Sequence, residues 1–205
     1  LFEDGIMPSP TTLTGSLEQP PAKVGSMTVH HGDVFIFTGN GGGGVGDPLL
    51  RSPELVAFDA RNGYVDDEMA RTVYGVVVQL DGTVDVDATD QLRAHIRAER
   101  IGAAPTRPAS LDGLYGGITR RDQEWHCGYC TESLGPSTSN FRDATVRSVI
   151  ALADHHDQHR MHIRRRPPGE PQLEMRTHYC PACASAIVTD VALAGSEPVM
   201  AARAT

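Results

Sequence analysis

Aromatic side chains, cysteines and long hydrophobic runs are all scarce in this chain of 205 residues. Phe, Trp and Tyr together make up 5% of the chain, and the hydrophobic content of 40% is enough for a modest core. No run approaches the roughly 20 apolar residues that a transmembrane helix needs. Residues 1–5 also lack the basic and apolar regions of a secretory signal. We therefore expect a soluble, cytoplasmic protein with no membrane partner.

The formal net charge is −8 at pH 7, and the surplus negative charge lies in the first part of the chain. Residues 1–119 contain 8 basic and 16 acidic side chains, whereas residues 120–205 contain 10 of each. A nucleic-acid-binding face needs basic and aromatic side chains interleaved on one surface. The charge balance and the few aromatics therefore predict that nucleic acid is not a partner.

The four cysteines form two CxxC pairs, Cys127 with Cys130 and Cys180 with Cys183. Two such pairs facing each other supply four thiolates in a tetrahedron, which is the ligand set that suits Zn²⁺ best. A catalytic zinc normally keeps one position open for water or substrate, and four cysteines leave none open. We predict a structural zinc ion held by all four cysteines.

Other uses of the cysteines fit the sequence less well. A thioredoxin-like redox site would need a single CxxC pair at the start of a helix. Two disulfides would need an oxidising compartment. His126 and His178 each stand near a CxxC pair and could replace a cysteine as a ligand, but hydrogen bonds to the sulfurs or to backbone are the simpler expectation. Trp125 is expected to pack over the first pair.

Histidines and arginines gather between the two pairs. His155 and His159 have the i,i+4 spacing of two ligands on one helical face. No HExxH acid accompanies them, and prolines follow at residues 167 and 168, so an exposed loop is the simpler interpretation. With Arg164, Arg165 and Arg166 this segment could instead dock on an acidic partner surface.

A small, proline-rich stretch at residues 103–110 predicts a joint in the chain. We predict a first unit at residues 1–102, a linker at 103–122, a cysteine-containing module at 123–192 and a tail at 193–205. In the first unit we expect strands within residues 27–38 and a hairpin of residues 76–80 and 83–86 around Asp81 and Gly82. Three helices are expected: from Ser52 to Asn62, from Asp66 or Asp67 to Gly75, and from Thr89 or Asp90 to Gly102.

The glycine block at residues 39–46 allows two interpretations. Exposed amides of such a loop can bind phosphate, but the Lys-Ser/Thr end of a P-loop is missing, and Asp47 and Pro48 follow where a dinucleotide-binding helix would begin. Close packing against another backbone segment, or positive φ at several positions, is the favoured explanation.

Residues 39–78 read GNGGGGVGDPLLRSPELVAFDARNGYVDDEMARTVYGVVV, and residues 81–100 read DGTVDVDATDQLRAHIRAER. These strings resemble the C-terminal end of the hydantoinase B/oxoprolinase family, with similarity over about residues 28–100. That family includes the large subunits of ATP-dependent hydantoinases and of acetone and acetophenone carboxylases. The family's long N-terminal region, with its metal and substrate residues, has no counterpart here, so the resemblance assigns no catalytic and no cofactor-binding residue to this chain.

Residues 123–192 contain QEWHCGYC, then Leu134 and Gly135, then HYCPACASAIVTDVAL. This part is similar to the small zinc-binding subunit of acetophenone carboxylase and, less closely, to that of acetone carboxylase. Together the two resemblances imply a hetero-oligomer with a hydantoinase A-like ATP-binding subunit and a truncated hydantoinase B-like large subunit. ATP and a further divalent metal are expected only in those partners.

The expected fold class is α+β, with a β-rich segment and short helices completing a hydantoinase B-like subunit, followed by a four-cysteine zinc-ribbon module. The expected function is a small structural and assembly subunit of a carboxylase-like or hydantoinase-like enzyme. One alternative is a zinc-ribbon protein that binds nucleic acid or serves as a regulatory binding protein. A second is a stand-alone enzyme that uses the glycine block and histidines, which the lack of a paired acid and base disfavours.

Overall fold

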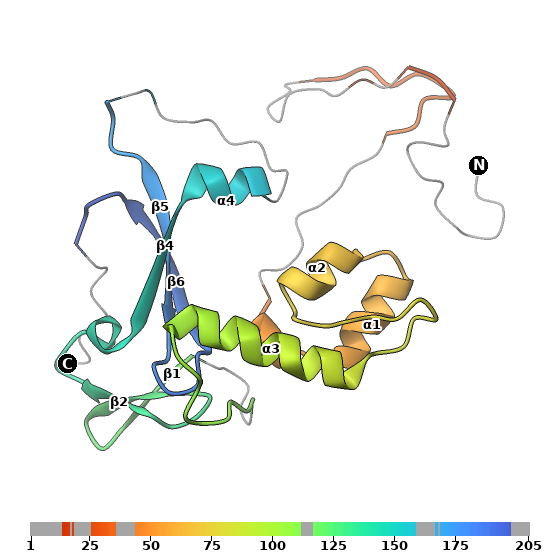
Figure 1. Ribbon diagram of the computed structural model, residues 1–205. Helices are drawn as coiled ribbons and strands as arrows, with labels where there is room; N and C mark the ends of the chain where they lie inside the picture. The colour runs from red at the N-terminus through yellow and green to blue at the C-terminus, as the bar shows by residue number, and fades with distance from the viewer. Residues whose placement is uncertain are drawn as a thin grey trace. The chain divides into compact units, whose positions relative to one another are not determined.

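A computed structural model of the chain describes residues 14–16, 18, 26–35, 44–111, 117–158, 167 and 169–197 (Figure 1). The chain divides into two compact units, residues 1–43 and residues 44–205. In the described part of the first unit, a turn at His31 and Gly32 brings the Asp33 carboxylate to 2.7 Å from the His30 N–H. Residues 26–35 contain no strand, so the strand prediction is wrong there, and residues 36–38 lie outside the described residues.

The second unit begins with helices and ends with two antiparallel sheets, so the predicted α+β class is confirmed. None of the described helices is long and apolar enough to cross a membrane. Its elements in chain order are η3 (Pro48–Leu50), α1 (Pro53–Arg61), α2 (Asp67–Thr72), α3 (Val86–Ile101), β1 (Ile118–Arg121), β2 (Glu124–Cys127), β3 (Ser133–Pro136), η4 (Phe141–Ala144), β4 (Val146–Ala151), α4 (Leu152–Gln158), β5 (Leu173–Tyr179) and β6 (Ala186–Leu193).

The helices begin at side-chain caps. Ser52 accepts the Leu55 N–H at the start of α1, and Asp66 accepts the Met69 N–H at 2.7 Å at the start of α2, as predicted. Helix α3 begins at Val86 with Asp85 as its N-cap, so the predicted start at Thr89 or Asp90 was too late. The later start was predicted because Val86 was assigned to the second strand of the hairpin, whereas the Asp85 carboxylate accepts the Ala88 N–H and caps a helix that begins at Val86.

The predicted hairpin forms only as a turn with one β-bridge. Asp81 Oδ1 accepts the Thr83 N–H at 2.9 Å, and the Gln79 N–H donates to the Thr83 carbonyl at 2.8 Å. A single bridge joins Val78 and Val84, and the residues beyond enter α3. The described residues 44–102 are therefore mainly helical, and the predicted β-rich character of this segment is wrong for them.

Arginines on one face of α3 hold the segment that follows the glycine block. Their guanidinium groups donate to every second residue of the segment 47–51. The segment runs antiparallel to the helix, so the last arginine of the helix meets the first residue of the segment. The three contacts are Arg100 to the Asp47 carboxylate at 2.6 Å, Arg97 to the Leu49 carbonyl at 3.4 Å and Arg93 to the Arg51 carbonyl at 2.7 Å. Leu49 is thereby held with 1% of its surface exposed.

The two sheets each contain three strands in chain order, β1-β2-β3 and β4-β5-β6. The first CxxC pair begins where β2 ends, and the second lies between β5 and β6. The largest described core lies between these connections. It contains Cys127, Tyr129, Leu134, Phe141, Cys180, Ala182 and Cys183.

The stretch predicted to be a linker contacts both cysteine pairs. The N–H groups of Thr106 and Arg107 both donate to the Ala182 carbonyl, at 2.8 and 3.1 Å, and the Ser110 N–H donates to the Tyr129 carbonyl at 3.0 Å. Residues 103–111 therefore lie against the cysteine-containing part. The boundaries 1–102, 103–122, 123–192 and 193–205 stay a prediction.

Candidate metal centre

The structure brings the four cysteine sulfurs together. All four Sγ atoms lie within 4.8 Å of one another, with Cys127 and Cys183 3.8 Å apart and Cys130 and Cys180 3.6 Å apart. A tetrahedral ion with four metal–sulfur bonds of about 2.3 Å separates its sulfurs by about 3.8 Å. A disulfide would need about 2.05 Å. The cluster is therefore sized for a metal ion and is compatible with zinc.

The two CxxC connections have the same backbone hydrogen bonds, and we call each one a knuckle. In each knuckle, the residue directly after the second cysteine donates its N–H to the carbonyl of the first cysteine. The first cysteine in turn donates its own N–H to the carbonyl of the residue two positions after the second cysteine. The bonds are Thr131 to Cys127 (3.0 Å), Cys127 to Glu132 (2.8 Å), Ala184 to Cys180 (2.9 Å) and Cys180 to Ser185 (2.9 Å). This repeated geometry aims both sulfurs of a knuckle to one side.

One residue in each knuckle has left-handed backbone geometry. Thr131 has a φ of 61° and Ala184 a φ of 59°, in the region that glycine occupies most readily. This conformation costs an ordinary residue about 1 kcal/mol or more, and Thr is also β-branched. This conformational cost falls at the residue of each knuckle where the backbone turns back past the two sulfurs.

The first knuckle also depends on a close backbone approach at Gly128. The Gly128 N–H donates to the Gly117 carbonyl at 2.9 Å, and a Cβ on Gly128 would lie 3.1 Å from the Gly117 nitrogen. A Cβ on Gly117 would in turn lie 3.0 Å from the Ile187 carbonyl oxygen. Residues around both knuckles therefore pack backbone to backbone.

The acidity of the four thiols is uneven because they hydrogen-bond one another. Bonds from Cys127 and then Cys180 lower the pKa of Cys183 to about 2. The bond with Cys180, then the bond with Cys183 and burial, raise the pKa of Cys127. Burial is the first cause that raises the pKa of Cys130, to about 12. A bound dication would favour the thiolate form of all four side chains.

The flanking histidines lie outside the cluster, and only His126 contacts backbone as predicted, since the partner of His178 is a side-chain hydroxyl. His126 Nδ1 lies 3.2 Å from the Thr131 carbonyl oxygen, and His178 Nδ1 lies 2.8 Å from Thr145 Oγ1. Among the described residues, the four cysteines are the one group of three or more His, Cys, Asp and Glu side chains close enough to hold a metal. His159 lies outside the described residues, so the histidine pair with His155 cannot be placed.

Trp125 packs against the core that contains the cysteines, as predicted from the sequence. Its ring meets the Phe141 ring edge to face, with centroids 6.1 Å apart, and its indole N–H donates to the Ser139 carbonyl at 3.1 Å. This side chain is the only Trp of the chain and so reports on the packing around the first knuckle.

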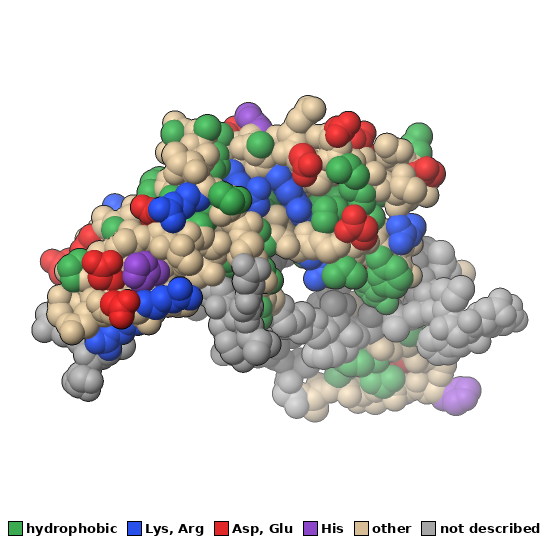
Figure 2. Space-filling view, turned by 90° about the horizontal axis from the view of Figure 1, so that it is seen from below, with side chains coloured by type: hydrophobic (Ala, Val, Ile, Leu, Met, Phe, Trp, Pro, Cys, Tyr) green, Lys and Arg blue, Asp and Glu red, His purple; other side chains and the backbone are tan. Residues whose placement is uncertain are grey.

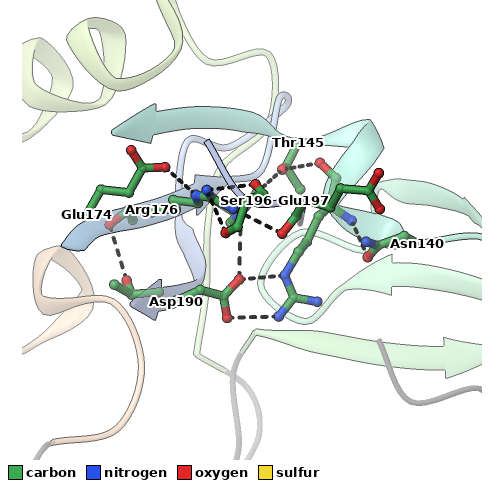
Figure 3. Close-up of polar contacts among 11 residues, drawn as sticks. Asn140, Thr145, Glu174, Arg176, Asp190, Ser196 and Glu197 are labelled. Carbon is green, nitrogen blue, oxygen red and sulfur yellow. Dashed lines mark hydrogen bonds and ion pairs between the residues drawn. The ribbon is translucent and has the colours of Figure 1, made fainter. Parts of the chain in front are cut away.

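Buried ion pairs support the β4-β5-β6 sheet beside the second knuckle. Arg142 donates twice to Asp190, at 2.7 and 3.0 Å, and Arg176 donates to Glu174 at 2.6 Å and to the Ser196 carbonyl at 2.9 Å (Figure 3). Burial and then the positive charge of Arg142 lower the pKa of His178. The strand that leads to Cys180 is therefore held by charged groups with partners inside the chain.

Asp47 is a residue that sequence reasoning missed. Its buried carboxylate accepts the Leu49 N–H at 2.9 Å, the Arg100 guanidinium at 2.6 Å and the Ala186 N–H at 2.8 Å. Asp before Pro indicates a helix cap, which Asp47 is, but nothing local indicates Ala186 as a partner. This carboxylate connects the helical part with the second knuckle.

The described end of the glycine block has positive φ angles. Gly44 has a φ of 69° and open space where a Cβ would stand. Gly46 has a φ of 83°, and its Cβ would lie 3.5 Å from the Tyr129 hydroxyl. Backbone conformation therefore explains both glycines, whereas residues 39–43 lie outside the described residues.

Fold and site thus define an α+β chain with a closed four-cysteine cluster, and comparison with known proteins adds a relationship. No family model matches the chain. Three curated proteins are similar to about one third of it. They are the alpha subunit of acetone carboxylase from Xanthobacter autotrophicus (45% identity over 73 residues), the B subunit of a putative D-/L-hydantoinase from a Pseudomonas species (35% over 80) and the beta subunit of caprolactamase from Pseudomonas jessenii (44% over 68).

These matches cover 34%, 39% and 33% of this chain but only 9%, 14% and 12% of the respective relatives. The chain therefore spans about a tenth of the length of the relatives that it matches. The relatives are named as subunits, so the comparisons connect one third of this chain to the hydantoinase B-like kind of subunit in multi-subunit enzymes. The resemblance to that family is confirmed to this extent.

Proposed function

We propose that this chain is a small, zinc-binding structural and assembly subunit of a multi-subunit enzyme that activates a ketone or a cyclic amide. The observation that carries the proposal is the similarity of one third of the chain to subunits of three such enzymes. Acetone, hydantoin and caprolactam, the compounds in those names, all present a carbonyl group to the enzyme. A polarised carbonyl carbon is therefore the chemistry common to the candidate substrates.

Zinc would be held by Cys127, Cys130, Cys180 and Cys183. Three of the four cysteines are fully buried, and a closed site of this kind contributes to folding rather than to chemistry. The ion would join the two knuckles, which come from segments about 50 residues apart in the chain. No described residue is proposed as catalytic, and the reaction centre is proposed to lie in partner chains.

The partners proposed are a hydantoinase A-like subunit that binds ATP and a truncated hydantoinase B-like large subunit. A zinc-ribbon protein for nucleic acid would be the rival. On the face shown in Figure 2, basic side chains are interspersed with acidic and apolar ones, which suits a protein partner better than a phosphate backbone.

Purification of a tagged copy from the native host, followed by identification of bound chains, tests this proposal. We expect a hydantoinase A-like and a hydantoinase B-like chain in fixed ratio, and ATP-dependent consumption of a ketone, hydantoin or lactam by the complex. A monomer that turns over substrate alone would overturn the proposal. Recovery with nucleic acid, and without either chain, would favour the rival.

A further inference from the structure

The Ser185 side chain is buried beside the second knuckle without a regular hydrogen bond. Ser185 is 0% exposed, and among the described residues its Oγ atom has no partner in hydrogen-bond geometry. Burial of a hydroxyl without a partner is unfavourable, and folded proteins keep few such groups. The unpaired hydroxyl therefore points to an acceptor that becomes strong only under some condition of the site.

The sulfur of Cys183, two residues earlier in the chain, is the acceptor that the hydroxyl faces. After the bonds from Cys127 and then Cys180, the hydroxyl and the N–H of Ser185 are the next groups that lower the pKa of Cys183. A neutral thiol is a weak acceptor, whereas hydrogen bonds to an ionised acceptor are about twice as strong as neutral ones. A thiolate at Cys183 would therefore satisfy the hydroxyl.

Backbone contacts on both sides of Ser185 hold it in place. The Ala184 carbonyl accepts the Arg100 guanidinium at 3.2 Å, and the Ala186 N–H donates to the Asp47 carboxylate at 2.8 Å. Both contacts belong to one buried ion pair. The hydroxyl is thus carried by a segment with fixed partners, which is the support that a hydrogen bond to a metal ligand needs.

The first knuckle has Glu132 at the equivalent position. Glu132 and Ser185 each accept the N–H of the first cysteine of their knuckle. Burial raises the pKa of Cys130 and the Glu132 N–H opposes this, so backbone N–H groups serve the two knuckles alike. The Glu132 carboxylate pairs with Arg107 at 3.0 Å and has no proton to donate. A side-chain hydroxyl therefore distinguishes the second knuckle from the first.

Resting on the proposed zinc site, we propose that Ser185 is a further residue of the metal centre, and that its hydroxyl donates a hydrogen bond to the Cys183 thiolate when the four cysteines hold the metal. This bond draws electron density from the sulfur and compensates a charge that is buried away from water. Ser185 is a positioning residue: it does not bind the ion itself, but it orients one ligand and strengthens metal retention.

The test uses the full-length chain loaded with Co²⁺ in place of Zn²⁺, because the thiolate-to-Co²⁺ charge-transfer band reports the electron density on the sulfurs. Ser185→Ala removes the proposed donor, and Ser185→Thr keeps a hydroxyl. Ser133→Ala is the matched control, because it removes an exposed hydroxyl near the first knuckle that donates to Glu124 at 2.9 Å rather than to a sulfur. Competition with a chromophoric chelator measures the Zn²⁺ affinity of each protein.

We expect Ser185→Ala to move the charge-transfer band to lower energy, because a sulfur without the hydrogen bond gives up electron density more easily. The same variant should bind Zn²⁺ about tenfold more weakly, at the lower end of the usual loss when a metal ligand loses its hydrogen-bond partner. Ser133→Ala should match the wild type in both measurements, and Ser185→Thr should keep the wild-type band.

A hydroxyl that stays without a partner predicts the opposite result. Ser185→Ala would then leave the band and the affinity unchanged and would raise the Tm of the metal-loaded chain, because it removes an unpaired buried group. That result would overturn the inference. Equal affinity losses in Ser185→Ala and Ser185→Thr without a band shift would assign the effect to packing and also overturn it. A wild-type chain that binds neither Zn²⁺ nor Co²⁺ would instead overturn the proposed zinc site itself.

Discussion

Asp47 and Arg100, which are 53 residues apart in sequence, form a buried ion pair of 2.6 Å beside the second cysteine knuckle. The same carboxylate accepts the N–H of Ala186, and the same guanidinium donates to the carbonyl of Ala184 at 3.2 Å. Ala184 directly follows Cys183, and Ala186 begins β6. The ion pair therefore couples the folding of the helical part to the geometry of the cysteine cluster.

Asp47→Asn should lower the free energy of unfolding by about 3 kcal/mol, because it leaves the Arg100 charge buried without a counter-charge. Urea denaturation of the metal-loaded chain measures this. Asp59→Asn is the matched control, since it removes the more exposed pair with Arg51 and should cost less than about 1 kcal/mol. Equal losses of unfolding free energy in the two variants would show that the buried pair stabilises the chain no more than the exposed one.

Thr131→Gly should raise the free energy of unfolding by about 0.5 to 1 kcal/mol. Relief of the left-handed strain at a φ of 61° exceeds the extra backbone entropy that glycine loses on folding. Ala98→Gly in α3 is the control and should destabilise by about 1 kcal/mol. Thermal denaturation compares the three proteins, and a lower Tm for Thr131→Gly would contradict the strain assigned to the first knuckle.

Gly128→Ala should destabilise the chain by about 1 to 3 kcal/mol, because its Cβ would press on the Gly117 backbone at 3.1 Å. The backbone must move to relieve this contact, and the movement displaces the first knuckle. Competition with a chromophoric chelator should therefore also show weaker metal retention. Unchanged stability together with unchanged retention would mean that residues 117 and 128 separate at no cost.

Much of the helical part follows from local sequence. The caps Ser52 and Asp66 and the left-handed stop at Gly102 lie where their residue types predict, since a cap depends on hydrogen bonds within a few residues. The cysteine spacing likewise predicts the cluster, because four sulfurs in two pairs have few other uses in such a chain.

What the sequence did not predict depends on distant partners. Asp47 has an ordinary capping position, and its contact with Ala186 exists only once helices and sheet have packed. Val86 was assigned to a strand from β-propensity, but the cap at Asp85 determines the helix start. The alternation of charged and apolar side chains in β5 suggests the wrong buried face. Its charged residues are the buried ones, because Ser196, Glu197 and η4 supply partners for the charged face.

Removal of the proposed zinc with a chelator should unfold the sheets around the knuckles, because binding free energy of a closed site is folding free energy. Trp125 fluorescence should shift to longer wavelength as the packing against Phe141 is lost. Zn²⁺ should restore the signal and Mg²⁺ should not. A spectrum that the chelator leaves unchanged, with metal shown to be removed, would contradict a structural role.

Native mass spectrometry of the complex purified from the host tests the central claim most directly, because one spectrum reports both metal and partners. The predicted mass is that of a complex of this chain with one zinc ion, a hydantoinase B-like chain and a hydantoinase A-like chain. A chain recovered alone, with less than half an equivalent of zinc, would contradict it.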